Sequence, residues 1–328
     1  MLAGSAASVT TMTAESFSLE ALTHLKRQRL EACAALQGRT KRRLVFARSE
    51  ALELLAIEKP IEPETERRRS DADVVVATAA EKTHINGVRF LKWSGPIAVI
   101  DDVGRILSCT TPVCTWAHYA GILTLEELVV LADAMMRRNG HLTRATPEDF
   151  VAYLDSAQRF AGIDNCRRAL KLMRPGTDSS QETRTRLALM AYGLPAPEVN
   201  HPVRLGNGRM ALMDMAYPQV RVAIEYDGGH HRFSAEQVLR DDKRREALER
   251  LGWIYIKVTV LDLRDEESRA ALAERVASAF EAVLGVPVPL TPRMTLWQVS
   301  DGRRSARRPI WERVPVSMWR APWASASH

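Results

Sequence analysis

A strand, a long helix and another strand follow one another around residue 225, and this succession limits the fold more than any other feature. The strand "QVRVAIEYD" alternates its side chains, the helix "FSAEQVLRDDKRREALERLG" ends at Gly252, and "WIYIKVTV" is again strand-like. Ser234 has the chemistry of the N-cap of this helix, with Gln237 as its partner. An earlier helix, "DSSQETRTRLALMAYGLP", precedes the strand "RMALMDMA", which Tyr217-Pro218 connects to the next strand. The order helix, strand, strand, helix, strand, helix predicts an α/β fold.

The rest of the chain divides into regions of different character. Residues 1–13 lack the basic and apolar parts of a secretory signal, and we expect a disordered leader there, or an early start codon. Residues 14–60 have a mostly helical pattern. Strand-like runs follow, "DADVVVATA", "GVRFLKW", "PIAVIDD" and "GRILSCT", and then two helical runs, the first with Thr124 and Glu127 at capping-box spacing. We therefore expect an α+β region over 14–174, an α/β domain over 175–288 and a tail over 289–328.

Composition excludes some classes of protein and favours others. Of 328 residues, 46% are hydrophobic and 26% charged, and no apolar run is long enough for a transmembrane helix. Four cysteines do not make a disulfide framework, so we expect a cytoplasmic protein with no membrane partner. The net charge of +6 is compatible with a polyanionic partner such as DNA.

Two carboxylates share one face of the strand that ends at residue 227. Side chains alternate along a strand, so Glu225 and Asp227 face one side, and Asp214 on the neighbouring strand can approach Glu225. Like charges this close repel unless a proton or a cation intervenes. Mg²⁺ or Mn²⁺ is the natural cation for oxygen ligands, and it supports phosphodiester hydrolysis. We expect Asp214 and Glu225 to bind the metal, whereas Asp227-Gly228 could instead be turn chemistry.

Further candidates lie near these acids in the sequence. His230 and His231 follow the strand, and either could move a proton, because histidine titrates near neutral pH. Glu182 could add an acidic ligand through water, although a capping box with Ser179 explains it equally well. We expect the following basic residues to contact DNA, with solvated faces and an edge-strand lysine as the alternatives: Arg184, Arg186, Lys257, Lys41, Arg42 and Arg43. Asp241 and Asp242 are expected to pair with Arg244 and Arg245 along their helix.

Two other patterns leave their interpretation open. The tail interleaves arginines with Trp297, Trp311, Trp319 and Trp323, a composition suited to single-stranded nucleic acid; a disordered tail or tryptophans docked on the domain are the alternatives. Cys109, Cys114 and His118 have a spacing that resembles a zinc site, but buried thiols are commoner.

The motifs together resemble a known family. The run "SSQETRTRLALMAYGLP … LMDMAYPQVRVAIEYDGGHHR … LRDDKRREALERLGWIYIKVT" resembles bacterial Vsr-like proteins, which look like very-short-patch-repair endonucleases of the PD-(D/E)XK superfamily. The resemblance covers about residues 178–288 and implies a restriction-endonuclease-like domain with a central mixed sheet and flanking helices. Residues 44–137 more weakly resemble the AbiEi-like region that precedes such domains and is named after type IV toxin–antitoxin antitoxins.

The resemblance also implies roles for individual residues. It makes Asp214 the metal-binding aspartate, Glu225 the acid of the (D/E)XK element, Glu182 the helix acid, and His230 or His231 the downstream histidine. Asp227 occurs where that element usually has lysine, and no cysteine follows Cys166, so no zinc site of the repair-endonuclease kind is expected.

Two functions follow from these expectations, and a third stays open. The first is a Mg²⁺-dependent DNA endonuclease. The second is an AbiEi-like DNA-binding antitoxin or regulator whose nuclease-like domain is inactive, which the missing lysine favours. A host-defence factor that acts with a toxin or another partner protein is the third.

Overall fold

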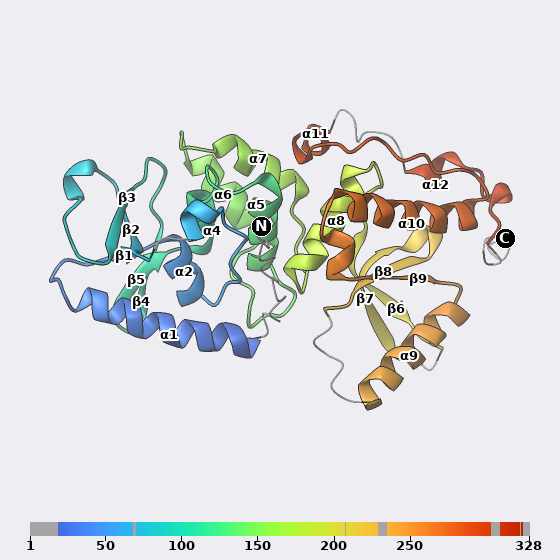
Figure 1. Ribbon diagram of the computed structural model, residues 1–328, viewed down its shortest axis with the longest axis horizontal. Helices are drawn as coiled ribbons and strands as arrows, with labels where there is room; N and C mark the ends of the chain where they lie inside the picture. Colours follow the sequence, from blue (N-terminus) through green and yellow to red (C-terminus); the bar gives the residue numbers. More distant parts are fainter. Residues whose placement is uncertain are drawn as a thin grey trace, which may run out of the picture.

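The computed structural model of the chain describes residues 19–67, 70–206, 208–228, 235–302, 309–321 and 323. Within these residues the protein is mixed α/β, with two mixed sheets surrounded by helices (Figure 1). The strands are β1 (Val45–Phe46), β2 (Ala72–Val76), β3 (Val88–Lys92), β4 (Val99–Val103), β5 (Leu107–Thr110), β6 (Glu198–Arg204), β7 (Met210–Tyr217), β8 (Val222–Tyr226) and β9 (Ile254–Val258).

Helices account for much of the remaining chain. The α-helices are α1 (Leu19–Gln37), α2 (Arg48–Leu54), α3 (Glu64–Arg67), α4 (Pro112–His118), α5 (Leu125–Met135), α6 (Pro147–Ser156), α7 (Ile163–Leu172), α8 (Ser180–Ala191), α9 (Ala235–Arg250), α10 (Glu266–Leu284), α11 (Leu296–Ser300) and α12 (Ile310–Arg313). Short 3₁₀ turns are η1 (Ala79–Glu81), η2 (Pro218–Val220), η3 (Val260–Leu263) and η4 (Val316–Met318).

The first sheet has the strand order β3-β2-β1-β5-β4 and combines parallel and antiparallel pairs. The four strands predicted from the sequence correspond to β2, β3, β4 and β5, so these predictions are confirmed. The central strand β1 was not predicted, because it has only two residues inside a stretch that has a helical pattern. Its Phe46 is fully buried in the large core that α2, α4, α5 and α7 share.

The second sheet has the order β6-β7-β8-β9. Its first two pairs are antiparallel and β8 pairs with β9 in parallel. The predicted alternation of β8 is confirmed. Val222 and Ile224 pack in the core with α10, whereas Ala223 packs with Leu248 of α9 on the opposite face. Helices α8 and α10 therefore cover one face and α9 covers the other (Figure 1). The strand β6 was not predicted; it is an edge strand that contains Pro202, which edges tolerate.

Buried ion pairs join α8 to the first region. Arg184 makes two hydrogen bonds with Glu127 of α5, at 2.9 and 2.8 Å, and Arg186 donates to Asp133 at 2.6 Å and to the carbonyl of Leu172 at 2.6 Å. Arg184 is 6% exposed and Arg186 is not exposed at all. The prediction that these two arginines contact DNA is therefore wrong, because their guanidinium groups are buried against carboxylates of the same chain.

Thr124 and Glu127 also behave differently from the predicted capping box. Thr124 accepts a hydrogen bond from the Glu127 backbone at 3.2 Å, as an N-cap does. The Glu127 side chain, however, binds Arg184 and the backbone N–H of Ile61 instead of returning to the cap. The cap is thus confirmed as a helix start, and the acid serves the contact between α5 and α8.

The described part of the tail docks on the protein. Trp311 lies 5.9 Å from the ring of Tyr217 and 5.6 Å from that of Phe280, and Arg168 stacks over Trp297 at 4.0 Å. Ile310 and Ala321 are buried in the core of the second sheet. Trp311, Trp319 and Trp323 pack against this core and follow the docking alternative, whereas Trp297 is 47% exposed. Residues 303–308 lie outside the described part of the chain. No helix among the described residues is long and apolar enough to cross a membrane.

Cys109, Cys114 and His118 are buried in the first core, and the cysteines are free thiols. His118 Nε2 lies 3.6 Å from Cys114 Sγ, and the imidazole meets the Trp93 ring edge-on at 4.5 Å. Burial, followed by the positive charge of Arg48, lowers the pKa of His118 to about 3. This imidazole is therefore a neutral core group near pH 7.

The buried His118 is expected to make the protein lose stability in mild acid. The unfolded chain binds this proton near pH 6.5 and the folded chain only near pH 3, so stability is lost as the pH falls between these values. Lowering the pH from 6.5 to 5 should cost about 1–2 kcal/mol through this group alone. Urea denaturation of wild type and His118→Gln at both pH values measures it; an equal loss in the variant would contradict this assignment.

Candidate functional site

The candidate site lies where α8, β7 and β8 meet. Glu182 comes from the first turn of α8, Asp214 from the middle of β7 and Glu225 from near the end of β8. Met215 pairs with Ile224 at the end of the antiparallel ladder, and the Asp214 carboxylate accepts a hydrogen bond from the backbone of Tyr226, the residue after Glu225. Three acids that are far apart in the sequence are therefore brought to one part of the sheet.

Glu182 is a buried acid at the start of α8, and a second acid, Asp214, lies near it. Glu182 is 5% exposed, accepts a hydrogen bond from Ser179 Oγ at 2.9 Å and accepts another from the Asp178 backbone at 3.0 Å. Burial, with the negative charge of Asp214 as the next cause, raises the pKa of Glu182 to about 8. Glu182 thus takes part in the start of α8, but its side chain accepts from the Asp178 backbone where a capping box uses the backbone of the N-cap residue, Ser179. The negative charge of Asp214 acts on the same carboxyl group.

Asp214 lies at an irregular point of β7. Met213 packs with the cluster on the α9 side and Met215 with the cluster on the α10 side, so the alternation of the strand breaks between them. Opposite this point on β6, Asn200 has a positive φ of 50°. The Asp214 carboxylate accepts a hydrogen bond from the Tyr226 backbone at 2.9 Å, and its pKa is raised, mainly by burial. Irregularities of this kind change the direction in which a side chain points, and they are common next to functional sites.

Glu225 contacts a cation and a phenol. One carboxylate oxygen binds Arg244 of α9, and the other accepts a hydrogen bond from Tyr255 of β9 at 2.9 Å. The same guanidinium nitrogen of Arg244 donates to the Leu212 carbonyl on β7. Burial and the charge of Glu225 raise the pKa of Tyr255, so this phenol stays a hydrogen-bond donor.

Asp227 and Lys257 form an ion pair beside Glu225. Lys257 is in register with Glu225 across the parallel strands β8 and β9, and its Nζ contacts the carboxylate of Asp227. The Lys257 side chain is 41% exposed, so its ammonium group remains accessible to a ligand. The second residue after Glu225 is thus acidic, and a lysine from the adjacent strand lies next to it.

The structure describes only some of the residues that were predicted to move protons or to bind a metal. His230 and His231 lie outside the described residues. Among the residues that the structure does describe, no three His, Cys, Asp or Glu side chains are grouped so that they could hold a metal ion. Glu182 and Asp214 are close together, but Glu225 is engaged by Arg244.

Arg244 and Tyr255 are site residues that the sequence analysis missed. Arg244 was expected to pair with an acid of its own helix, yet it pairs with Glu225, and Arg245 pairs with Glu249 at 2.8 Å. A signal existed in the sequence, because Arg244 is four residues before the buried Leu248 and so shares the helix face that looks at the sheet.

The basic cluster of Lys41, Arg42 and Arg43 lies in the loop between α1 and β1. Arg42 contacts Glu81 and lies over Phe90, and Arg43 contacts Asp101. Lys41 is exposed. Contact of these residues with DNA remains a prediction.

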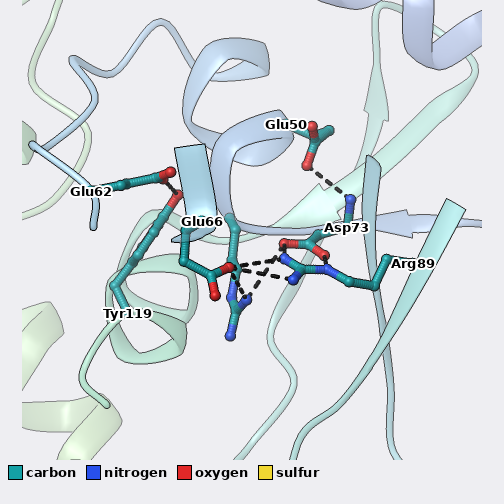
Figure 2. Close-up of polar contacts among 7 residues, drawn as sticks. Glu50, Glu62, Glu66, Asp73, Arg89 and Tyr119 are labelled. Atoms are coloured by element: carbon teal, nitrogen blue, oxygen red, sulfur yellow. Dashed lines mark hydrogen bonds and ion pairs between the residues drawn. The ribbon is translucent and has the colours of Figure 1, made fainter. Parts of the chain in front are cut away.

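A second group of charged side chains lies beside the first sheet (Figure 2). Arg89 contacts Asp73 at 2.5 Å and lies 3.3 Å from Glu66, and Tyr119 donates to Glu62 at 2.5 Å. The acids and arginines compensate one another across α3, β2, β3 and the end of α4. We therefore interpret this group as a structural network that fastens the segment around α3 to the sheet.

Comparisons with known proteins give relatives without an assigned activity. No protein-family model matches the chain, and no solved structure matches it. "Uncharacterized protein MT2308" and "Uncharacterized protein Rv2248", from two strains of Mycobacterium tuberculosis, are each 31% identical over 191 residues. The aligned part is 58% of this chain and 64% of each relative, so the chain spans just under two thirds of their length. The function is therefore inferred from the geometry of the site.

Proposed function

We propose that the chain is a divalent-metal-dependent DNA endonuclease of the Vsr-like type, acting on phosphodiester bonds in the cytoplasm. The observation that carries this proposal is the proximity of Glu182 and Asp214. Two acids from separate elements share a buried space, and the charge of one raises the pKa of the other. Such an arrangement is costly without a proton or a cation, so it is seldom kept for stability alone.

The chemistry of the donors fits a hard cation. All candidate ligands are carboxylate oxygens, which suit Mg²⁺ or Mn²⁺. Asp214 and Glu225 would hold the ion, and Glu182 would assist through water. Such an ion, when bound, polarises a phosphoryl oxygen and lowers the pKa of a bound water.

Other residues of the chain would act on the substrate directly. The accessible ammonium group of Lys257 is next to Glu225 and suits a phosphate contact. His230 or His231 would move a proton between water and substrate. The net charge of +6 favours association with DNA. The mixed four-stranded sheet with helices on both faces also agrees with the architecture that the Vsr-like resemblance implies.

Cleavage by the purified full chain tests the proposal. With Mg²⁺ or Mn²⁺ it is expected to cut plasmid, mismatched duplex or single-stranded DNA, and excess chelator is expected to stop the reaction. Calorimetric titration of Mn²⁺ into the protein without DNA gives a second readout. Intact DNA in all three assays, together with no measurable Mn²⁺ binding, would refute the enzyme.

One observation favours a second candidate function. Arg244 and Tyr255 already satisfy Glu225, and Asp227 occupies the usual lysine position, as in a site that no longer reacts. The alternative is a DNA-binding AbiEi-like regulator or antitoxin, with a toxin or defence protein as its possible partner. It predicts DNA binding that Asp214→Ala leaves intact, with no cleavage by wild type.

A further inference from the structure

Arg244 contacts both β7, which carries Asp214, and β8, which carries Glu225. A cation bound by these two acids would need the same position. The guanidinium nitrogen of Arg244 contacts both the Glu225 carboxylate on β8 and the Leu212 carbonyl on β7. The positive charge of Arg244 also acts on Asp214, which is two residues from Leu212. A side chain of α9 thus acts as the counter-ion of the two acids that the proposed function assigns to metal binding.

We propose that Arg244 is an exchangeable internal cation: it holds Glu225 until DNA arrives, then transfers to a backbone phosphate and leaves Glu225 to the metal. This inference rests on the proposed function and adds regulation of the same site. Its consequence is that DNA and divalent metal bind cooperatively and that the metal binds more weakly when DNA is absent.

The surroundings of Arg244 make such an exchange possible. Its side chain is 34% exposed, whereas that of Glu225 is 14% exposed, so the cation can reach solvent more easily than the acid. A guanidinium group binds phosphate and carboxylate with the same two-pronged geometry, so a phosphate can replace Glu225 as its partner. Glu225 keeps the 2.9 Å hydrogen bond from Tyr255 after the exchange, which holds its carboxylate in place.

The exchange has a thermodynamic signature. If DNA removes a competitor from the metal site, DNA must increase metal affinity by the same factor by which metal increases DNA affinity. Couplings of this kind are typically between about 5-fold and 150-fold, and we expect about tenfold here. A role of Arg244 in stability alone would give no coupling.

The test measures binding and needs no turnover. Mn²⁺ is titrated calorimetrically into wild type and Arg244→Gln without DNA, and a short fluorescent duplex is titrated with and without Ca²⁺. We expect Arg244→Gln to bind Mn²⁺ about tenfold more tightly than wild type, and Ca²⁺ to increase DNA affinity in wild type but not in the variant. Arg244→Lys keeps the positive charge but loses the two-pronged guanidinium geometry, so it provides an intermediate case. It is also the second variant if Arg244→Gln does not fold.

Arg250→Gln is the matched control, because Arg250 is an exposed arginine of the same helix that pairs with Glu246 at 2.9 Å. It should bind Mn²⁺ as wild type does. If Arg244→Gln binds Mn²⁺ no better than wild type, or if it keeps the coupling, the exchange is refuted while the nuclease proposal stands. If no protein binds metal with or without DNA, the proposed function itself fails and the exchange fails with it.

Discussion

Replacing Asp214 by asparagine is expected to remove DNA cleavage almost completely while the protein stays folded. The carboxylate accepts a hydrogen bond from the Tyr226 backbone, and an amide oxygen can accept that bond as well. The negative charge is what the variant loses, and with it a metal ligand. Loss of groups that only support a metal ligand costs about 10- to 100-fold, so loss of a ligand should cost at least about 100-fold in cleavage rate.

The variant also relieves the repulsion in the site. With residue 214 neutral, one cause of the raised pKa of Glu182 disappears, so the folded protein should be as stable as wild type or more stable. Circular dichroism and urea denaturation check the fold, and a plasmid-nicking assay with Mg²⁺ or Mn²⁺ measures the rate. Asp242→Asn, which changes an exposed acid of α9, is the control and should cleave normally. Full cleavage by Asp214→Asn would exclude the carboxylate as a ligand.

Replacing Asp133 by asparagine is expected to destabilise the protein by about 3–5 kcal/mol, because it leaves a buried guanidinium without its counter-ion. Both side chains of the Asp133–Arg186 pair are fully buried. Burial raises the pKa of Asp133, and Arg186 acts against this shift. Domains are stable by only about 5–15 kcal/mol, so this single change removes a large part of the total.

Two further variants separate charge from packing. Asparagine can still accept from the Arg174 backbone and contact Thr183, so the double variant Asp133→Asn, Arg186→Met should be more stable than the single variant. Asp164→Asn breaks an exposed ion pair with Arg167 and should cost about 0.5 kcal/mol or less. Urea denaturation curves give all three values. A loss of less than about 1 kcal/mol in Asp133→Asn would show that Arg186 is hydrated or compensated elsewhere.

The candidate site shows which properties local sequence can specify. The position of Asp214 beside the end of β8 was predicted, because alternation fixes the face of Glu225 and a hairpin brings the neighbouring strand beside it. The engagement of Glu225 by Arg244 was not predicted. Helix α9 supplies an arginine to the sheet only after it packs on β8 and β9, and pairing within the helix explains the same residue on local grounds.

The two arginines of α8 show the reverse case: contact with DNA was predicted, but the structure buries both side chains. The sequence "TRTRLALMA" places Arg184 and Arg186 on a helix whose polar residues could face solvent, so contact with DNA was expected. In the folded chain α5 presents Glu127 and Asp133 to them, so charge complementarity between two helices buries both. Leu187 then packs in the core of the first region and Leu189 in that of the second, so α8 belongs to both.

The sequence by itself determined the local structure of this protein: most of its strands, the capped starts of α5 and α8, and the acids that alternate onto one face of β8. These properties depend on neighbours within a few residues, which the sequence states directly. Only the tertiary structure decided which charges are buried, that Asp214 approaches Glu182, and that Arg244 holds Glu225. Such contacts join segments from about 20 to more than 50 residues apart, and their energies depend on burial, which no local pattern specifies.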